Sequence, residues 1–137
     1  MEKALNEQEA LGQLEIGYEK AKETLNDMDK IERLLQRAEK KLRSLPKVGD
    51  TLAVVPTFIS LVRSYILKEY TDVPIGSVIA IVSAITYVVS PMDIIPDWVP
   101  VAGYLDDLAV VNVCVKLVKS DVDEYCKWRE EKRKAIE

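Results

Sequence analysis

The sequence predicts an all-α fold, a small helical bundle with an amphipathic N-terminal helical arm and a proline-rich connector between two buried helices. Apolar residues recur at intervals of three and four along most of the chain, which is the period of a helix that buries one face. Three of the 6 prolines, at positions 91, 96 and 100, interrupt that pattern together. A length of 137 residues suits one hydrophobic core. We divide the chain into an arm, 1–47, and a helical domain, 48–137, that ends in a charged helix.

The arm carries one apolar stripe among charged residues. Its members, mostly three or four positions apart, are Leu11, Leu14, Tyr18, Ala21, Leu25, Met28, Ile31, Leu35, Ala38, Leu42 and Leu45. Residues Asn26 to Asp29 include good capping residues, and Asp29 and Glu32 have capping-box spacing, so we expect a helix break near 26–29. The stripe predicts either an arm that folds back on its own domain or a coiled coil that binds a partner or a second copy.

Two apolar segments open the domain. We expect one helix over 50–68, bent near Pro56. The next segment, 73–92, holds no charged residue and is long enough to reach across a bilayer core of roughly 30 Å. Proline, glycine and hydroxyl residues shorten its strongly apolar part, which favours a buried core helix over 75–89. A membrane hairpin remains the alternative.

The chain closes with a long helix from Leu105 that continues into a charged end. Its apolar face consists of Leu108, Val111, Val115, Val118, Val122 and Tyr125. Trp128 stands among charged residues, where an aromatic ring more often packs onto its own domain than binds a ligand. We therefore expect Trp128 against the bundle and the turns from Arg129 onward in solvent.

Composition excludes several kinds of chemistry. The chain has no histidine, which removes Ser-His-Asp and Cys-His catalysis and zinc sites that use imidazole. Cys114 and Cys126 lack CxxC spacing, so we expect two reduced thiols in a cytoplasmic protein. The charged first residues do not resemble a cleavable secretion signal. No basic stripe or aromatic platform indicates a nucleic acid partner.

Charge is distributed unevenly along the chain. Residues 1–47 hold ten acids and ten bases, whereas residues 48–118 hold seven acids against three bases and account for the net charge of −4. Four of those seven acids lie between 93 and 107, around the three clustered prolines. Because each proline biases the residue before it towards extended geometry, this segment is a structured connector. Gly103 follows it and supplies a positive-φ position or a close backbone approach.

The connector carries a long and specific motif that reads YVVSPMDIIPDWVPVAGYLDD from Tyr87 to Asp107. This motif closely resembles the signature of the YkvA-like family, catalogued as domain of unknown function 1232, and the resemblance covers about a third of the chain, from 75 to 113. It implies a small all-helical module, often membrane-associated, with no established activity. It also singles out a structural or functional motif: Tyr87, Ser90, Pro91, Asp93, Pro96, Asp97, Pro100, Gly103, Tyr104, Asp106 and Asp107.

The four aspartates of this motif admit two interpretations. As a structural brace, Asp106 and Asp107 lie in the first turn of the helix after Gly103 and complement its positive end, while Asp93 and Asp97 cap turns. As a binding site, converging carboxylates need a neutralising cation, so they would hold Ca²⁺ or Mg²⁺, although EF-hand spacing is absent.

The functional hypothesis is a non-enzymatic helical interaction module, soluble or peripherally membrane-associated, that associates with a protein partner or with itself. The lack of any nucleophile–base pair favours it over catalysis. An integral membrane hairpin is one alternative, and a divalent-metal site or enzyme at the four aspartates is another. Without such a site no cofactor is expected, and Arg63 or Lys68 would supply the counter-charge. We expect a cytoplasmic location, with membrane association as the open alternative.

Overall fold

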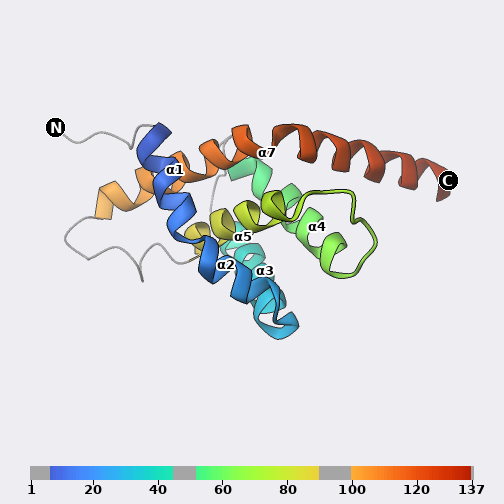
Figure 1. Cartoon of the computed structure of the whole chain (residues 1–137), viewed down its shortest axis with the longest axis horizontal. Helices are drawn as coiled ribbons and strands as arrows, with labels where there is room; N and C mark the ends of the chain where they lie inside the picture. Colours follow the sequence, from blue (N-terminus) through green and yellow to red (C-terminus); the bar gives the residue numbers. More distant parts are fainter. Residues whose placement is uncertain (1–6, 45–51, 90–99, 137) are drawn as a thin grey trace.

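The computed structural model describes residues 7–44, 52–89 and 100–136, and within its last helix it describes side chains from residue 110 onward. These residues form an all-α bundle, as the sequence predicted, and no strand occurs in the three ranges. The helices in chain order (Figure 1) are α1 (Glu7–Ile16), α2 (Tyr18–Leu25), α3 (Met28–Ser44), the 3₁₀ turn η1 (Leu52–Val54), α4 (Val55–Ile66), α5 (Ile75–Val89) and α7 (Pro100–Ile136).

Helix α5 is the centre of the bundle, because α1, α2, α3, α4 and α7 all pack against it. Residues on every side of it are buried, among them Val78, Ile81, Val82 and Ile85 at 0% exposure. Its 15 residues span about 22 Å, which is shorter than a bilayer core of roughly 30 Å. None of the helices in the described ranges combines the length and the apolar character that crossing a membrane requires.

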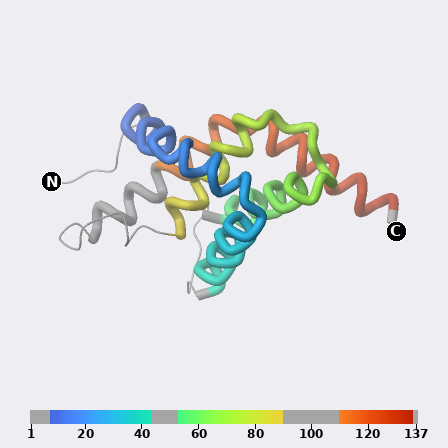
Figure 2. The backbone as a smooth tube through the Cα atoms, turned by 60° about the horizontal axis from the view of Figure 1, so that its bottom comes forward, coloured from blue at the N-terminus to red at the C-terminus, as the bar shows by residue number. Residues whose placement is uncertain are grey.

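Helices α1, α2 and α3 place the apolar stripe of the arm in this same core. Leu14, Ala21, Ile31 and Leu35 are at most 1% exposed and belong to one cluster with the buried residues of α4, α5 and α7. Figure 2 shows the tight turn that joins α2 and α3 into a helical hairpin, and α3 also packs against α4. The stripe is thus covered by the chain's own helices. Among the members of the stripe that the structure describes, which leave out Leu45, Met28 is the exception, at 55% exposure.

Two breaks divide this region. The first, at Gly17, was not predicted from the sequence. The second separates α2 from α3, within the expected range, but the capping residue is Asp27 and not Asp29. The Asp27 Oδ1 accepts hydrogen bonds from the backbone N–H groups of Asp29 at 3.0 Å and Lys30 at 3.2 Å. This satisfies two of the donors that the first turn of α3 leaves free.

Helix α4 is shorter than expected and is not bent at Pro56. Pro56 lies in the first turn of α4, where a proline costs no hydrogen bond. The residues before it form the separate turn η1, and no continuous helix passes through the proline. At the other end, Lys68 has φ 63°, and the N–H groups of Lys68 and Glu69 bond the carbonyls of Tyr65 and Ser64. This Schellman motif turns the chain towards α5.

Helix α7 begins earlier than expected, at Pro100. Gly103 is therefore a helical residue and not part of a connector, and Asp106 and Asp107 lie beyond the first turn, which contains no acid. The helix has non-helical dihedral angles at Val118. The expected apolar face is confirmed from Val111 to Tyr125, with Val111, Val118 and Tyr125 at most 1% exposed.

Trp128 packs onto the bundle, as predicted. The centroid of its ring lies 4.9 Å from the ring centroid of Tyr70 and 5.7 Å from that of Tyr125. Tyr70 belongs to the loop between α4 and α5, so the three rings attach the second half of α7 to that loop. Beyond them, the side chains of residues 129–135 are exposed.

We predict that Gly17→Ala destabilises the fold because the helix break approaches α5 closely. An added Cβ would lie 2.4 Å from the Ser83 Oγ, which donates a 2.8 Å hydrogen bond to the Leu14 carbonyl. The φ of −83° at Gly17 suits any residue, so the cost is steric. Losing this buried bond should lower the unfolding free energy by about 1–3 kcal/mol in urea titrations.

Two comparisons test the cause. Gly12→Ala has nothing within 4 Å of its new Cβ and lies inside α1, so it should stabilise the protein by about 0.5–1 kcal/mol. Ser83→Ala should largely remove the added cost of Gly17→Ala. Additive effects of the two substitutions would contradict the proposed contact.

We predict that Cys114 resists thiol reagents in the folded protein. It is fully buried and donates weakly to the Ala80 carbonyl, and burial raises the pKa of its thiol from 9.0 to about 12. The thiolate is the reactive form, so alkylation at neutral pH should modify the half-buried Cys126 first. Mass spectrometry after timed labelling measures both sites. Equal labelling rates without unfolding would be inconsistent with this packing.

Candidate functional site

The structure describes only part of the signature. Tyr87 lies in α5, buried, and donates a hydrogen bond to the Gln13 side chain of α1. Ser90, Pro91, Asp93, Pro96 and Asp97 lie outside the described residues. For Pro100, Gly103, Tyr104, Asp106 and Asp107 the backbone is described, as part of α7. The choice between a carboxylate brace and a metal site therefore stays a prediction. Among the described side chains, no group of three or more metal-ligating residues occurs.

Helix α5, from whose end the signature segment leaves, is held at that end by α3. The Lys41 Nζ donates a 2.7 Å hydrogen bond to the Val88 carbonyl. A cation here satisfies a carbonyl of the last turn and complements the negative end of the helix dipole. The last turn of α5 is thus held at Val88 by a residue of the arm.

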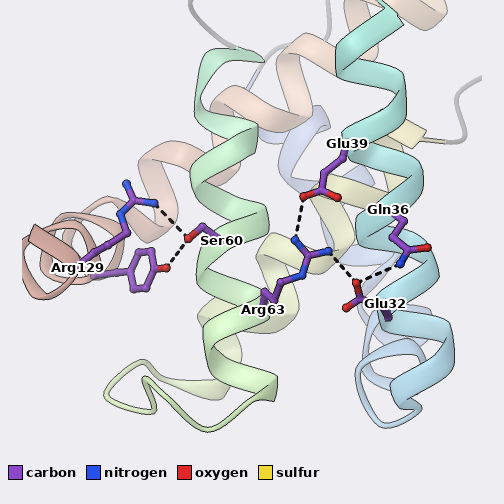
Figure 3. Close-up of polar contacts among 7 residues, drawn as sticks. Glu32, Gln36, Glu39, Ser60, Arg63 and Arg129 are labelled. Atoms are coloured by element: carbon purple, nitrogen blue, oxygen red, sulfur yellow. Dashed lines mark hydrogen bonds and ion pairs between the residues drawn. The ribbon is translucent and has the colours of Figure 1, made fainter. Parts of the chain in front are cut away.

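Arg63 of α4 binds two carboxylates of α3 (Figure 3). Its Nη1 donates to Glu39 Oε2 and its Nη2 to Glu32 Oε2, both at 2.9 Å. The Gln36 side chain also donates to Glu32, at 3.4 Å. The hydrogen bond to Glu39, followed by that to Glu32, raises the pKa of Arg63 against the opposing effect of burial. Both arms of the guanidinium therefore face α3. The side chains of the signature aspartates lie outside the described ones, so the counter-charge from Arg63 or Lys68 stays a prediction.

A cleft of about 250 Å³ lies beside Arg63, with Ser60, Ser64 and Glu69 among its lining residues. The Tyr125 Oη lies 2.5 Å from Ser60 Oγ and 3.0 Å from Ser64 Oγ. Arg129 Nη1 donates to Ser60 Oγ at 3.2 Å (Figure 3). A nucleophilic serine needs a general base within hydrogen-bond reach. The partners of Ser60 are a phenol and a guanidinium, so this arrangement holds α7 on α4 and does not activate a nucleophile.

A second cleft, of about 350 Å³, opens where the α2–α3 turn meets the end of α4 and the start of α5. We call it the apolar cleft. Its lining residues are Leu25, Asn26, Met28, Tyr65, Ile66, Lys68, Thr71 and Ile75. Met28 and Ile75 are 55% and 52% exposed, and Leu67, between two lining residues, is 54% exposed. Large apolar side chains are thus gathered in contact with solvent at one end of the bundle.

Sequence reasoning did not find either cleft. The signal for Arg63 was present in α3, because Glu32, Gln36 and Glu39 follow helical spacing and share one face. Nothing in the sequence paired that face with α4. Met28 was assigned to the buried stripe, but the turn at Asn26 and Asp27 places it outside the core.

The comparisons with known proteins agree with the signature. A family model described as "Protein of unknown function (DUF1232)" matches residues 77–113. The chain is 33% identical over 75 residues to the "Uncharacterized membrane protein YkvA" of Bacillus subtilis (strain 168). The aligned residues make up 55% of this chain and 71% of that protein. No solved structure matches. The extent of this alignment, together with the signature from Tyr87 to Asp107, shows that the chain belongs to the YkvA-like, DUF1232 family.

Proposed function

We propose that this chain is a non-enzymatic helical interaction module that attaches peripherally to a membrane surface through its apolar cleft. The observation that carries the proposal is the exposure of Met28 and Ile75, which line one cleft at an end of the bundle. The Bacillus relative is described as a membrane protein, which supports a lipid surface over other apolar partners.

The composition of the cleft suits an interface between lipid and water. Tyr65 has an apolar ring and a polar tip, a combination that is favoured at the headgroup level of a bilayer. Lys68 stands at the rim on the exposed turn after α4, and its long side chain can keep the ammonium among headgroups while its stem contacts apolar atoms. The backbone at this rim is fixed by the Schellman motif, so these groups are presented without further folding.

We expect Met28→Gln with Ile75→Gln to weaken binding to phosphatidylcholine vesicles. Burying such a side chain contributes about 1.5–3 kcal/mol, so each substitution should lower partitioning about tenfold or more. Vesicle co-sedimentation measures the partition coefficient. Both side chains are more than half exposed, so the folded state should keep its stability.

The matched control is Leu117→Gln, an apolar residue of α7 with 53% exposure that does not line the cleft. It should bind like the unmodified chain. A peripheral protein should also be released from vesicles by alkaline carbonate, whereas an integral hairpin should stay. Retention through that wash, or equal binding by all variants, would reject the proposal. Light scattering without vesicles completes the test, because a dimer that the cleft substitutions dissociate would assign the cleft to self-association instead.

We further propose that the contacts of Arg63 are structural. Its side chain and those of Glu32 and Glu39 are 30–41% exposed, so the solvent screens them only in part. Arg63→Met leaves two carboxylates of one helix face without their cation. We expect the unfolding free energy to fall by about 1 kcal/mol in denaturant titrations at low salt. Since salt screens the pair, the loss should shrink at high salt, and a loss independent of salt would contradict the ionic origin.

A further inference from the structure

The charges of α3 separate onto two flanks of the helix. At 3.6 residues per turn, Glu32 and Glu39 project to one side of the buried Ile31, Leu35 and Ala38. Their flank meets Arg63 of α4. Three cations, Lys30, Arg33 and Arg37, project to the other side, and all three are exposed. Helix α3, which has three acids and six bases in its sequence, is therefore acidic towards α4 and basic towards α2.

The basic flank borders a cleft of about 230 Å³ between α2, α3 and α5, which we call the basic cleft. Besides the apolar Leu34, its lining residues are the cations Lys20, Lys30, Arg33 and Arg37 and the hydroxyl residues Thr24 and Thr86. These residues come from three helices, so the four positive charges converge through tertiary packing. No carboxylate occurs among the described residues that line the cleft.

The four cations form no ion pair within the part of the chain that the structure describes. Its ion pairs use Lys22, Arg63, Lys119 and Arg133, and none uses a cation of the basic cleft. Glu32 and Glu39, the acids of α3 beyond its first turn, are held by Arg63. Arg33 and Arg37 stand four residues apart on a helix, a spacing at which like charges repel. An anion in the cleft would relieve this repulsion.

We propose that the basic cleft binds a phosphate group. Arginine presents donors in a planar fork that matches phosphate oxygens, and Lys20 and Lys30 add compact charges from two helices. Thr24 and Thr86 donate their hydroxyl hydrogens to the carbonyls of Lys20 and Val82, both at 2.9 Å, so the cations supply the donors. The volume is below the range of about 300–1,000 Å³ for sites of drug-sized ligands. A phosphate group fits a site of this size and charge, whether it belongs to a soluble compound or to a lipid headgroup.

The test compares thermal unfolding in inorganic pyrophosphate with unfolding in sodium chloride of equal ionic strength. Binding to the native state should raise the Tm of the unmodified chain with pyrophosphate concentration. Arg33→Gln with Arg37→Gln should abolish that rise and weaken binding at least tenfold by calorimetry. Both side chains are exposed, so the variant should fold, and loss of repulsion should leave its own Tm equal or higher.

The control is Arg43→Gln with Lys127→Gln, which removes the same charge from exposed positions outside the basic cleft. It should keep the full pyrophosphate response. If both double variants lost the pyrophosphate-dependent rise in Tm equally, the rise would be an effect of net charge and the proposed site would be wrong. A rise in pyrophosphate no larger than the rise in sodium chloride would also overturn the proposal.

A second arm identifies the source of the phosphate. Vesicles containing phosphatidic acid, whose headgroup is a phosphate monoester, are compared with phosphatidylcholine vesicles. If the chain binds phosphatidic acid vesicles more strongly and pyrophosphate displaces it from them, the cleft binds a lipid headgroup. If pyrophosphate raises the Tm but the chain does not prefer phosphatidic acid vesicles, the cleft binds a soluble phosphate compound. The first arm contains no lipid, so its outcome is independent of the membrane attachment proposed for the apolar cleft.

Discussion

The fold depends on the covering of one uncharged helix. Helix α5 is too apolar to leave in water, and five other helices surround it. Its four polar side chains all make hydrogen bonds, and Thr86 bonds the Val82 carbonyl within the helix. The other three reach neighbouring helices: the Ser77 Oγ donates to Asp121 of α7 at 2.5 Å, Ser83 donates to the Leu14 carbonyl, and Tyr87 donates to Gln13. Buried polar groups without partners are costly, so these bonds fix how far α1 and α7 can slide along α5. The apolar surface supplies the driving force, and the three side chains supply the register.

Most of these helices could be located from the sequence, because the spacing of apolar residues depends only on residues that are close together in the chain. Ile75 to Val89 was found to the residue, and so was the apolar face of α7 from Val111 to Tyr125. Errors arose where a single residue decides between two local geometries. Pro56 begins a helix as easily as it bends one, and Gly17 breaks a helix that the apolar stripe alone continues. The start of α7 at Pro100 follows the same rule for prolines in a first helical turn.

The clefts were beyond sequence reasoning for a different reason. A count of ten acids and ten bases in residues 1–47 suggests a neutral arm. Docking α3 against the bundle places its two flanks against different neighbours, and within the described residues only the acidic flank forms ion pairs, with Arg63 of α4. Whether Lys30 or Glu32 forms an ion pair depends on the residues that α2 and α4 place next to it. The periodicity of α3 does not reveal those neighbours. The signature identified the family, but the apolar cleft and the basic cleft are lined by residues other than its aspartates.

The family match also has a consequence for how relatives should be compared. Of the matched stretch, 77–113, the structure describes the side chains of 77–89 and 110–113, and most of these are buried. A similarity that rests on them tracks the shared inside of the molecule. The apolar cleft and the basic cleft, through which we propose that the chain contacts other molecules, are built mainly by residues outside that stretch, such as Met28 and Arg33. Two members can therefore share the whole signature and still differ in what they touch, and an inherited role is better judged by aligning the α2–α3 hairpin than by scoring the motif.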